Sequence, residues 1–168
     1  MGKRDYIVSS AHLADPGAEE LSELEYGLIL AHNAFERWIV RCMAAAGHPD
    51  LSKIDVLVLH SVHHRGRPKR LADLCFVLNV EDSHVVTYAL RKLTQLGLVG
   101  RARPGKEVFY ATTAAGDEAC ARYREIRQAC LLAVPTPPLE RPERGEMAGL
   151  LRALSGLYDQ AARAATSL

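Results

Sequence analysis

The sequence predicts a mainly α-helical fold that contains one small β-hairpin. Apolar residues recur at three- and four-residue steps over most of the chain, which is the spacing of one face of an α-helix. The exception is the stretch at 98–112, where two short β-like runs flank a Pro-Gly pair. Hydrophobic residues make up 48% and charged residues 24% of the 168 residues, an ordinary globular composition that allows one domain with additional helices.

The composition also indicates where the protein works. No run approaches the roughly 18 apolar residues of a membrane span, and the first residues lack the apolar core of a signal peptide. The cysteines are far apart and form no Cys-x-x-Cys pair: Cys42, Cys75, Cys120 and Cys130. We therefore expect a cytoplasmic protein without membrane association, whose thiols pack in the core; an oxidation sensor built from Cys42, Cys120 and Cys130 is the alternative.

The first predicted helix is longer than a small core requires. After an arm at residues 1–18, a helix is expected from about Glu19 to Ala46, and Gly47-His48-Pro49 ends it. Its apolar stripe consists of Leu21, Leu24, Leu28, Ala31, Phe35, Trp38, Ile39 and Cys42. Because the stripe is so long, we expect part of it to face a second subunit.

The next segment predicts a helix-turn-helix. A helix capped by Asp50 or Ser52 runs to about His64, and a short helix with Leu71, Leu74, Cys75 and Leu78 inward follows the basic turn at 65–68. Asn79 suits a left-handed turn position, and Asp82 caps a further helix over about 82–96. Two helices joined by a turn of this size form a helix-turn-helix.

The helix at 82–96 has two contrasting faces. Its predicted inner face consists of Val85, Val86, Ala89, Leu90, Leu93 and Leu96. Its outer face, which includes His84, Thr87, Tyr88, Arg91 and Gln95, has hydrogen-bonding groups and one cation but no carboxylate. This pattern is typical of a helix that reads DNA bases, and we predict base contacts from Ser83, His84, Thr87, Tyr88 and Arg91.

A hairpin, or wing, over about 98–112 follows this helix. Pro104-Gly105 predicts its tight turn, and Val108 and Tyr110 are expected on the face toward the core. Thr112 or Thr113 then caps a helix to about Leu132, a proline-rich connector spans 134–142, and a last amphipathic helix runs from Glu143 to about Thr166. We expect an arm (1–18), an N-terminal dimerisation helix (19–49), a winged domain (50–112) and C-terminal dimerisation helices (113–168).

The charge is concentrated in the middle of the chain. The net charge is only +1. Nine Lys or Arg and three acids lie between His60 and Lys106, whereas the rest of the chain has twelve basic and seventeen acidic residues. A basic middle favours a polyanionic partner, although a solvated basic face is the simpler alternative. The predicted phosphate contacts are Arg65, Arg67, Lys69, Arg70, Lys92, Arg101, Arg103 and Lys106.

The order helix, helix, helix, hairpin is that of a winged helix, and residues 20–165 resemble the MarR-type winged-helix transcription regulators. The resemblance rests on LSKIDVLVLHSV, on KRLADLCFVLNVEDSHVVTYALRKLTQLGLV and on VFYATTAAGDEA, whose Thr112 or Thr113 and Gly116 match the family's "Leu-Thr-x-x-Gly" helix start. It implies a homodimer with one reading helix in each major groove. The expected dimer contacts are Leu21, Leu24, Leu28, Phe35, Leu150, Leu154, Leu157 and Tyr158. The wing is shorter than in many members and has no Asp.

Other chemistry is poorly supported. His60 and His64 have a metal-chelating spacing, but no acid lies nearby, and the position at a helix C-terminus explains the cluster with His63. The chain has no nucleophile motif, phosphate-binding glycine loop or dinucleotide fingerprint. We therefore expect no metal, no cofactor and no enzymatic activity. The predicted partners are double-stranded DNA, a second copy of the chain and a small-molecule effector of unspecified identity; a winged-helix module that binds another protein is the alternative.

Overall fold

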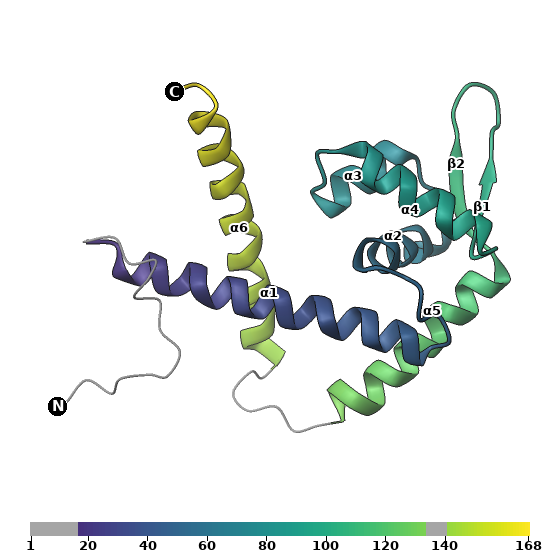
Figure 1. The fold of residues 1–168 in the computed structure, drawn as a ribbon, viewed down its shortest axis with the longest axis horizontal. Coiled ribbons are helices and arrows are strands. Elements are labelled where there is room, and N and C mark those ends of the chain that lie inside the picture. The colour runs from purple at the N-terminus through teal and green to yellow at the C-terminus, as the bar shows by residue number, and fades with distance from the viewer. Residues whose placement is uncertain (1–16, 134–140) are drawn as a thin grey trace. The chain divides into compact units, whose positions relative to one another are not determined.

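The computed structural model describes residues 17–133 and 141–168, which form two compact units that divide between Gln128 and Ala129 (Figure 1). The predicted arm, apart from Gly17 and Ala18, and most of the predicted connector lie outside the described residues. None of the described helices is both long and apolar enough to cross a membrane. The predicted fold class, a mainly helical protein with one hairpin, is confirmed.

Helix α2 (Lys53–His63) is at the centre of the first unit, where it contacts α1 (Glu19–Ala45), α5 (Ala114–Arg127), the helix-turn-helix and the hairpin (Figure 1). A capping box starts α2, because the Asp55 carboxylate accepts hydrogen bonds from the Ser52 backbone N–H at 2.8 Å and from its hydroxyl at 2.7 Å. The core residues of α2 are Val56, Val58, Leu59 and Val62. The wider core adds Ile39, Cys42 and Met43 from α1 and Ala119, Cys120 and Tyr123 from α5.

The helix-turn-helix consists of α3 (Leu71–Leu78) and α4 (Ser83–Gln95). Asn79 adopts the predicted left-handed conformation (φ 51°), and its backbone N–H bonds the carbonyls that end α3. Asp82 caps α4, as predicted, by accepting a hydrogen bond from the His84 backbone N–H at 2.9 Å. These two local devices fix the angle at which α4 leaves the turn.

The inner face of α4 is narrower than the sequence predicted. Val86, Ala89, Leu90 and Leu93 are buried, and they place α4 against α2 and α3. The prediction for Val85 and Leu96 was wrong, since 39% of Val85 and 49% of Leu96 remain exposed. Val85 lies about 100° around the helix from Val86, at the margin of the packed arc, and Leu96 follows the last helical residue.

The wing consists of β1 (Val99–Ala102) and β2 (Phe109–Thr112), paired antiparallel with Arg101 opposite Tyr110. Gly105 has the positive φ (73°) that its predicted turn position requires. The second strand is shorter than predicted, because it begins at Phe109 and leaves Val108 in the loop. Tyr110 nevertheless packs against the core, as expected.

The first turn of helix α5 requires glycine at position 116. The Thr113 hydroxyl accepts a hydrogen bond from the Gly116 backbone N–H at 3.1 Å, so Thr113 rather than Thr112 is the cap. A Cβ atom at Gly116 would lie 2.0 Å from the Leu98 carbonyl oxygen, so any other residue would push α5 away from the wing. Helix α5 packs on α1 and α2 and belongs to the first compact unit.

A π-helical turn (Gln128–Leu132) begins at the last residue of the first unit, and the second unit contains the rest of this turn and α6 (Arg141–Ala165). Large apolar side chains of α6 are exposed, including Met147, Leu150, Leu151 and Leu157. Where its side chains are described, α6 has no buried residue. An amphipathic helix of this length without a covered apolar face is expected to pack against a further surface.

Candidate nucleic-acid interface

The outer face of α4 presents hydrogen-bonding groups to solvent. Ser83, His84, Tyr88 and Arg91 are exposed, and Thr87 is half-buried. The structure thus brings all five predicted base-reading residues onto one helix face, and no carboxylate lies between residues 83 and 95. Such a face can donate to and accept from base edges without repelling phosphates.

Two of these side chains are already oriented. The Thr87 hydroxyl donates to the Ser83 carbonyl at 2.8 Å, so its methyl group and its oxygen lone pairs, but not its proton, are available to a ligand. The Arg91 guanidinium lies 5.7 Å from the centroid of the Tyr88 ring, within cation–π range. This stacking restricts Arg91 before any partner binds. The sequence had placed both residues on the same face, but it gave no signal for their contact.

The wing is anchored to the start of α3. Lys69 and Tyr110 exchange two backbone hydrogen bonds, of 2.8 and 2.9 Å, which add a third backbone segment to the hairpin. The Arg70 guanidinium donates to both carboxylate oxygens of Asp73, at 3.1 and 3.0 Å, and to Glu107 at 3.3 Å. Its side-chain hydrogen bonds hold the pKa of Asp73 below its usual value. Arg70 therefore connects the helix-turn-helix to the wing.

The predicted phosphate contacts occupy different places. Arg101, Arg103 and Lys106 are exposed on the wing. The Lys69 ammonium donates to the carbonyls of His64 and Arg67, and the Lys92 ammonium donates to the Asp50 carbonyl at 2.5 Å and to the buried Asp55 carboxylate at 2.8 Å. Lys92 thus fastens α4 to the start of α2. Arg65 and Arg67 lie in the loop that follows α2, a turn of 3-10 helix at His64–Gly66 and the residue after it.

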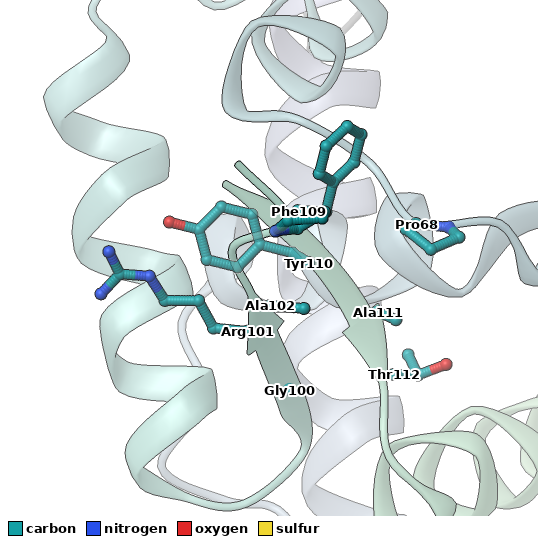
Figure 2. Close-up of a pocket in the computed structure, with 9 residues that line it drawn as sticks. Pro68, Gly100, Arg101, Ala102, Phe109, Tyr110, Ala111 and Thr112 are labelled. Atoms are coloured by element: carbon teal, nitrogen blue, oxygen red, sulfur yellow. The ribbon is translucent and has the colours of Figure 1, made fainter. Parts of the chain in front are cut away.

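A hollow of about 550 Å³ along the wing is lined mainly by apolar groups. Figure 2 shows Arg101 and Tyr110 as cross-strand neighbours and Pro68 beside strand β2. Gly100 has no side chain and Ala102 and Ala111 have only a methyl group, which leaves this surface open. Its lining can accept apolar atoms, and Arg101 is the one charged side chain among the lining residues.

The three histidines near the end of α2 have different environments. The ring of His60 meets the Tyr123 ring edge to face, with centroids 4.5 Å apart, and its Nε2 atom is buried without a hydrogen bond. Burial, reinforced by the positive charge of His63, lowers the pKa of His60 to about 4. The helix C-terminus therefore does not explain His60, a half-buried residue whose environment favours the neutral ring. His63 instead contacts the Asp117 carboxylate at 2.9 Å.

The cysteines are placed as packing residues in the first unit. Cys42 and Cys120 are buried, and Cys75 is half-buried. Burial raises the pKa of the Cys120 thiol to about 11, which disfavours the reactive thiolate. Cys130, in the second unit, is exposed. Among the described residues, no group of three or more His, Cys, Asp or Glu side chains could hold a metal ion.

Comparison with known proteins identifies the domain that carries this face. Residues 51–116 match the family model of the winged helix DNA-binding domain. This segment is therefore similar to winged helix DNA-binding domains. No curated protein matches the chain in sequence.

Solved structures of regulators resemble this chain over most of its length. A cysteine-to-serine mutant of MarR from E.coli, complexed with operator DNA, is 20% identical with a TM-score of 0.65, covering 84% of this chain and 99% of that chain. A MarR family regulator from Neisseria meningitidis is 15% identical with a TM-score of 0.63, covering 84% and 95%. CouR from Rhodococcus jostii RHA1, bound to p-coumaroyl-CoA, is 15% identical with a TM-score of 0.61, covering 78% and 90%. The resemblance to MarR-type regulators is thus confirmed in the fold.

Proposed function

We propose that this protein is a transcription regulator that binds double-stranded DNA sequence-specifically as a homodimer. In this proposal α4 enters the major groove, and the wing contacts the backbone or the minor groove. The observation that carries it is the outer face of α4, where exposed hydrogen-bonding side chains without a carboxylate lie beside a basic hairpin. The similarity of residues 51–116 to winged helix DNA-binding domains and the similarity of the fold to a MarR–operator complex support it.

The proposed base contacts divide along α4. Ser83, His84 and Thr87 are near the helix N-terminus, the end that usually lies deepest in the groove, so they carry most of the sequence preference. Arg91 is two turns further along, and its donors suit either a guanine edge or a phosphate. Tyr88 supports Arg91 through its ring and reaches bases with its hydroxyl.

The proposed phosphate contacts are mainly the cationic side chains that do not already contact another part of the protein. Arg101, Arg103 and Lys106 on the wing grip the backbone. Lys69 and Arg70 contribute mainly by holding the wing, and Lys92 by holding α4, because their charged groups already have partners. Arg65 and Arg67 are considered in the next subsection.

The proposed homodimer explains the exposed apolar surface of the outer helices. Leu21, Leu24 and Phe35 of α1 and Leu150 and Leu157 of α6 are each at least 45% exposed. Leu28, Leu154 and Tyr158 are half-buried on the same helices. Residues 19–49 and 113–168 are accordingly proposed as dimerisation segments, with α5 also serving as part of the winged unit's core.

The base-reading assignment is tested with His84→Ala, Thr87→Ala and Gln95→Ala as a control at the far end of α4. Preferred and random duplexes are titrated by fluorescence anisotropy. Loss of the His84 or Thr87 side chain should weaken binding of the preferred duplex by about 1–3 kcal/mol and binding of random duplex little, because base contacts confer sequence preference. Equal losses on both duplexes would show that these residues only position the helix. Gln95→Ala should change neither strongly.

A protein-binding module is the second candidate. Phe76 and Val77 on α3 are 86% and 69% exposed, and such an apolar pair is unusual on a surface that contacts only DNA. A module of this kind would bind duplex weakly, without preference between sequences. The duplex titrations therefore separate the two candidates.

A further inference from the structure

A second basic surface lies at the base of the wing, apart from the wing tip. A hollow of about 490 Å³ opens between the loop after α2, the end of β2 and α5. Arg65 and Arg67 line it from the loop, and Arg124 lines it from α5. Its volume is within the roughly 300–1,000 Å³ of typical small-ligand pockets.

The three guanidinium groups have no partner of opposite charge. All three side chains are exposed, and none forms an ion pair with another residue in the described part of the chain. The acid of the lining, Asp117, is already engaged: its carboxylate accepts a hydrogen bond from the Thr112 hydroxyl at 2.5 Å and contacts His63 at 2.9 Å. The hollow therefore has an excess of positive charge.

The loop that carries two of these arginines is held in shape. The Lys69 ammonium donates to the His64 carbonyl at 2.8 Å and to the Arg67 carbonyl at 2.6 Å. Arg65 and Gly66 both have positive φ, at 62° and 56°, and a left-handed arginine persists only where its surroundings impose it. The backbone that carries Arg65 and Arg67 is thus preformed.

The register of the wing separates this hollow from the proposed DNA-binding tip. Lys69 is bonded opposite Tyr110, and the hollow continues from there along Ala111 and Thr112, toward α5. Arg103 and Lys106 lie beyond the other end of the strands. The hollow along the wing face is less suited to this role, because its lining is mainly apolar and has a single guanidinium group, that of Arg101.

We propose that this hollow binds a small anion that carries two or more phosphate or carboxylate groups, held by Arg65, Arg67 and Arg124. A guanidinium group can donate two parallel hydrogen bonds to two oxygens of one phosphate or carboxylate group. A cluster of arginines therefore suits such a ligand better than it suits a chloride ion. Because guanidinium groups approach from two segments, a ligand with more than one anionic group contacts both. Since Thr112 belongs to β2, the bound anion would also brace the base of the wing.

The test uses the full-length protein and isothermal titration with pyrophosphate, and with citrate as the carboxylate probe. At least one probe should bind once per chain. Arg124→Gln and the double variant Arg65→Gln/Arg67→Gln should each weaken it about tenfold or more, as expected for lost hydrogen bonds between charged groups. The matched control is Arg122→Gln, because Arg122 is exposed on the same helix but pairs with Glu125 and does not line the hollow. Circular dichroism confirms that each variant is folded.

Three results would overturn the proposal. The first is that neither probe binds the folded wild-type protein. The second is that Arg122→Gln weakens probe binding as much as Arg124→Gln does. The third is that Arg124→Gln weakens binding of duplex DNA in the same proportion as binding of the probe, which would assign the arginines to backbone phosphates of DNA. Absence of any duplex binding by the wild type would refute the proposed function instead, while selective probe binding would still support this site.

Discussion

Replacing His60 should remove a pH-dependent part of the stability of this protein. The ring packs on Tyr123, and its Nε2 atom is buried without a partner. Protonating the folded protein would place a positive charge in this apolar site, close to His63 and to Arg124 and Arg127. The folded pKa is therefore about 4, compared with 6.5 for an unperturbed histidine.

The sign and size follow from proton linkage. Between pH 6.5 and 4 the unfolded chain binds a proton at His60 that the folded protein does not, so the free energy of unfolding falls as the pH is lowered. The shift corresponds to a contribution of about 3 kcal/mol, present above pH 6.5 and lost by about pH 4. His60→Phe keeps an aromatic ring against Tyr123 but has no titrating group, so it should lose this dependence.

The measurement is urea unfolding of wild type and His60→Phe from pH 4 to 7.5, at one fixed protein concentration because a dimer unfolds concentration-dependently. The stability of wild type relative to His60→Phe should fall steadily as the pH is lowered through this range. His84→Gln, which replaces an exposed ring, is the control. Its free energy of unfolding should change with pH in parallel with that of the wild type. If the difference between wild type and His60→Phe is constant with pH, the burial argument is refuted.

Three further changes test the packing of α4 and the role of the wing. Leu93→Ala should destabilise the folded protein by about 2–5 kcal/mol in the same urea assay, because Leu93 is fully buried; a loss below about 1 kcal/mol would contradict its place in the core. Lys92→Met should cost about 1–2 kcal/mol, since it leaves the buried Asp55 carboxylate without its cation while Lys92 itself is partly exposed; unchanged stability would show the pair to be neutral. Arg103→Ala combined with Lys106→Ala should reduce the salt dependence of duplex binding by roughly one to two counterions, and an unchanged slope would show that the tip does not touch phosphate.

Local chemistry made much of the fold predictable. Asn79, Asp82 and Thr113 each occupy a turn or cap position that depends on neighbouring backbone groups. Asn79 and Asp82 are where the sequence predicted, and Thr113 is one of the two caps that it allowed. The three- and four-residue spacing of apolar residues likewise located the helices, because that spacing depends only on local helix geometry. The width of the packed face on α4 was not predictable, because how far the core extends toward Val85 depends on which elements cover it.

The contacts that tune the candidate interface link distant parts of the chain. Arg70 meets Glu107 across 37 residues, as does Lys92 with Asp55, and a charge pattern in one sequence does not specify such partners. The environment of His60 also depends on Tyr123, far along the chain. The sequence could therefore predict which face of α4 is polar, but not which cations around it are free to contact a partner.

The most direct test of DNA reading is selection of bound sequences from a random duplex library by the purified protein, followed by titration of the best sequence and a scrambled duplex at several salt concentrations. We predict an enriched motif with two related half-sites about one helical turn apart, as two copies of α4 on one face of DNA require. The motif should bind about 10³-fold or more tightly than the scrambled duplex, and both affinities should fall steeply with salt. Equal, weak binding of the two duplexes with no enriched motif would contradict the account.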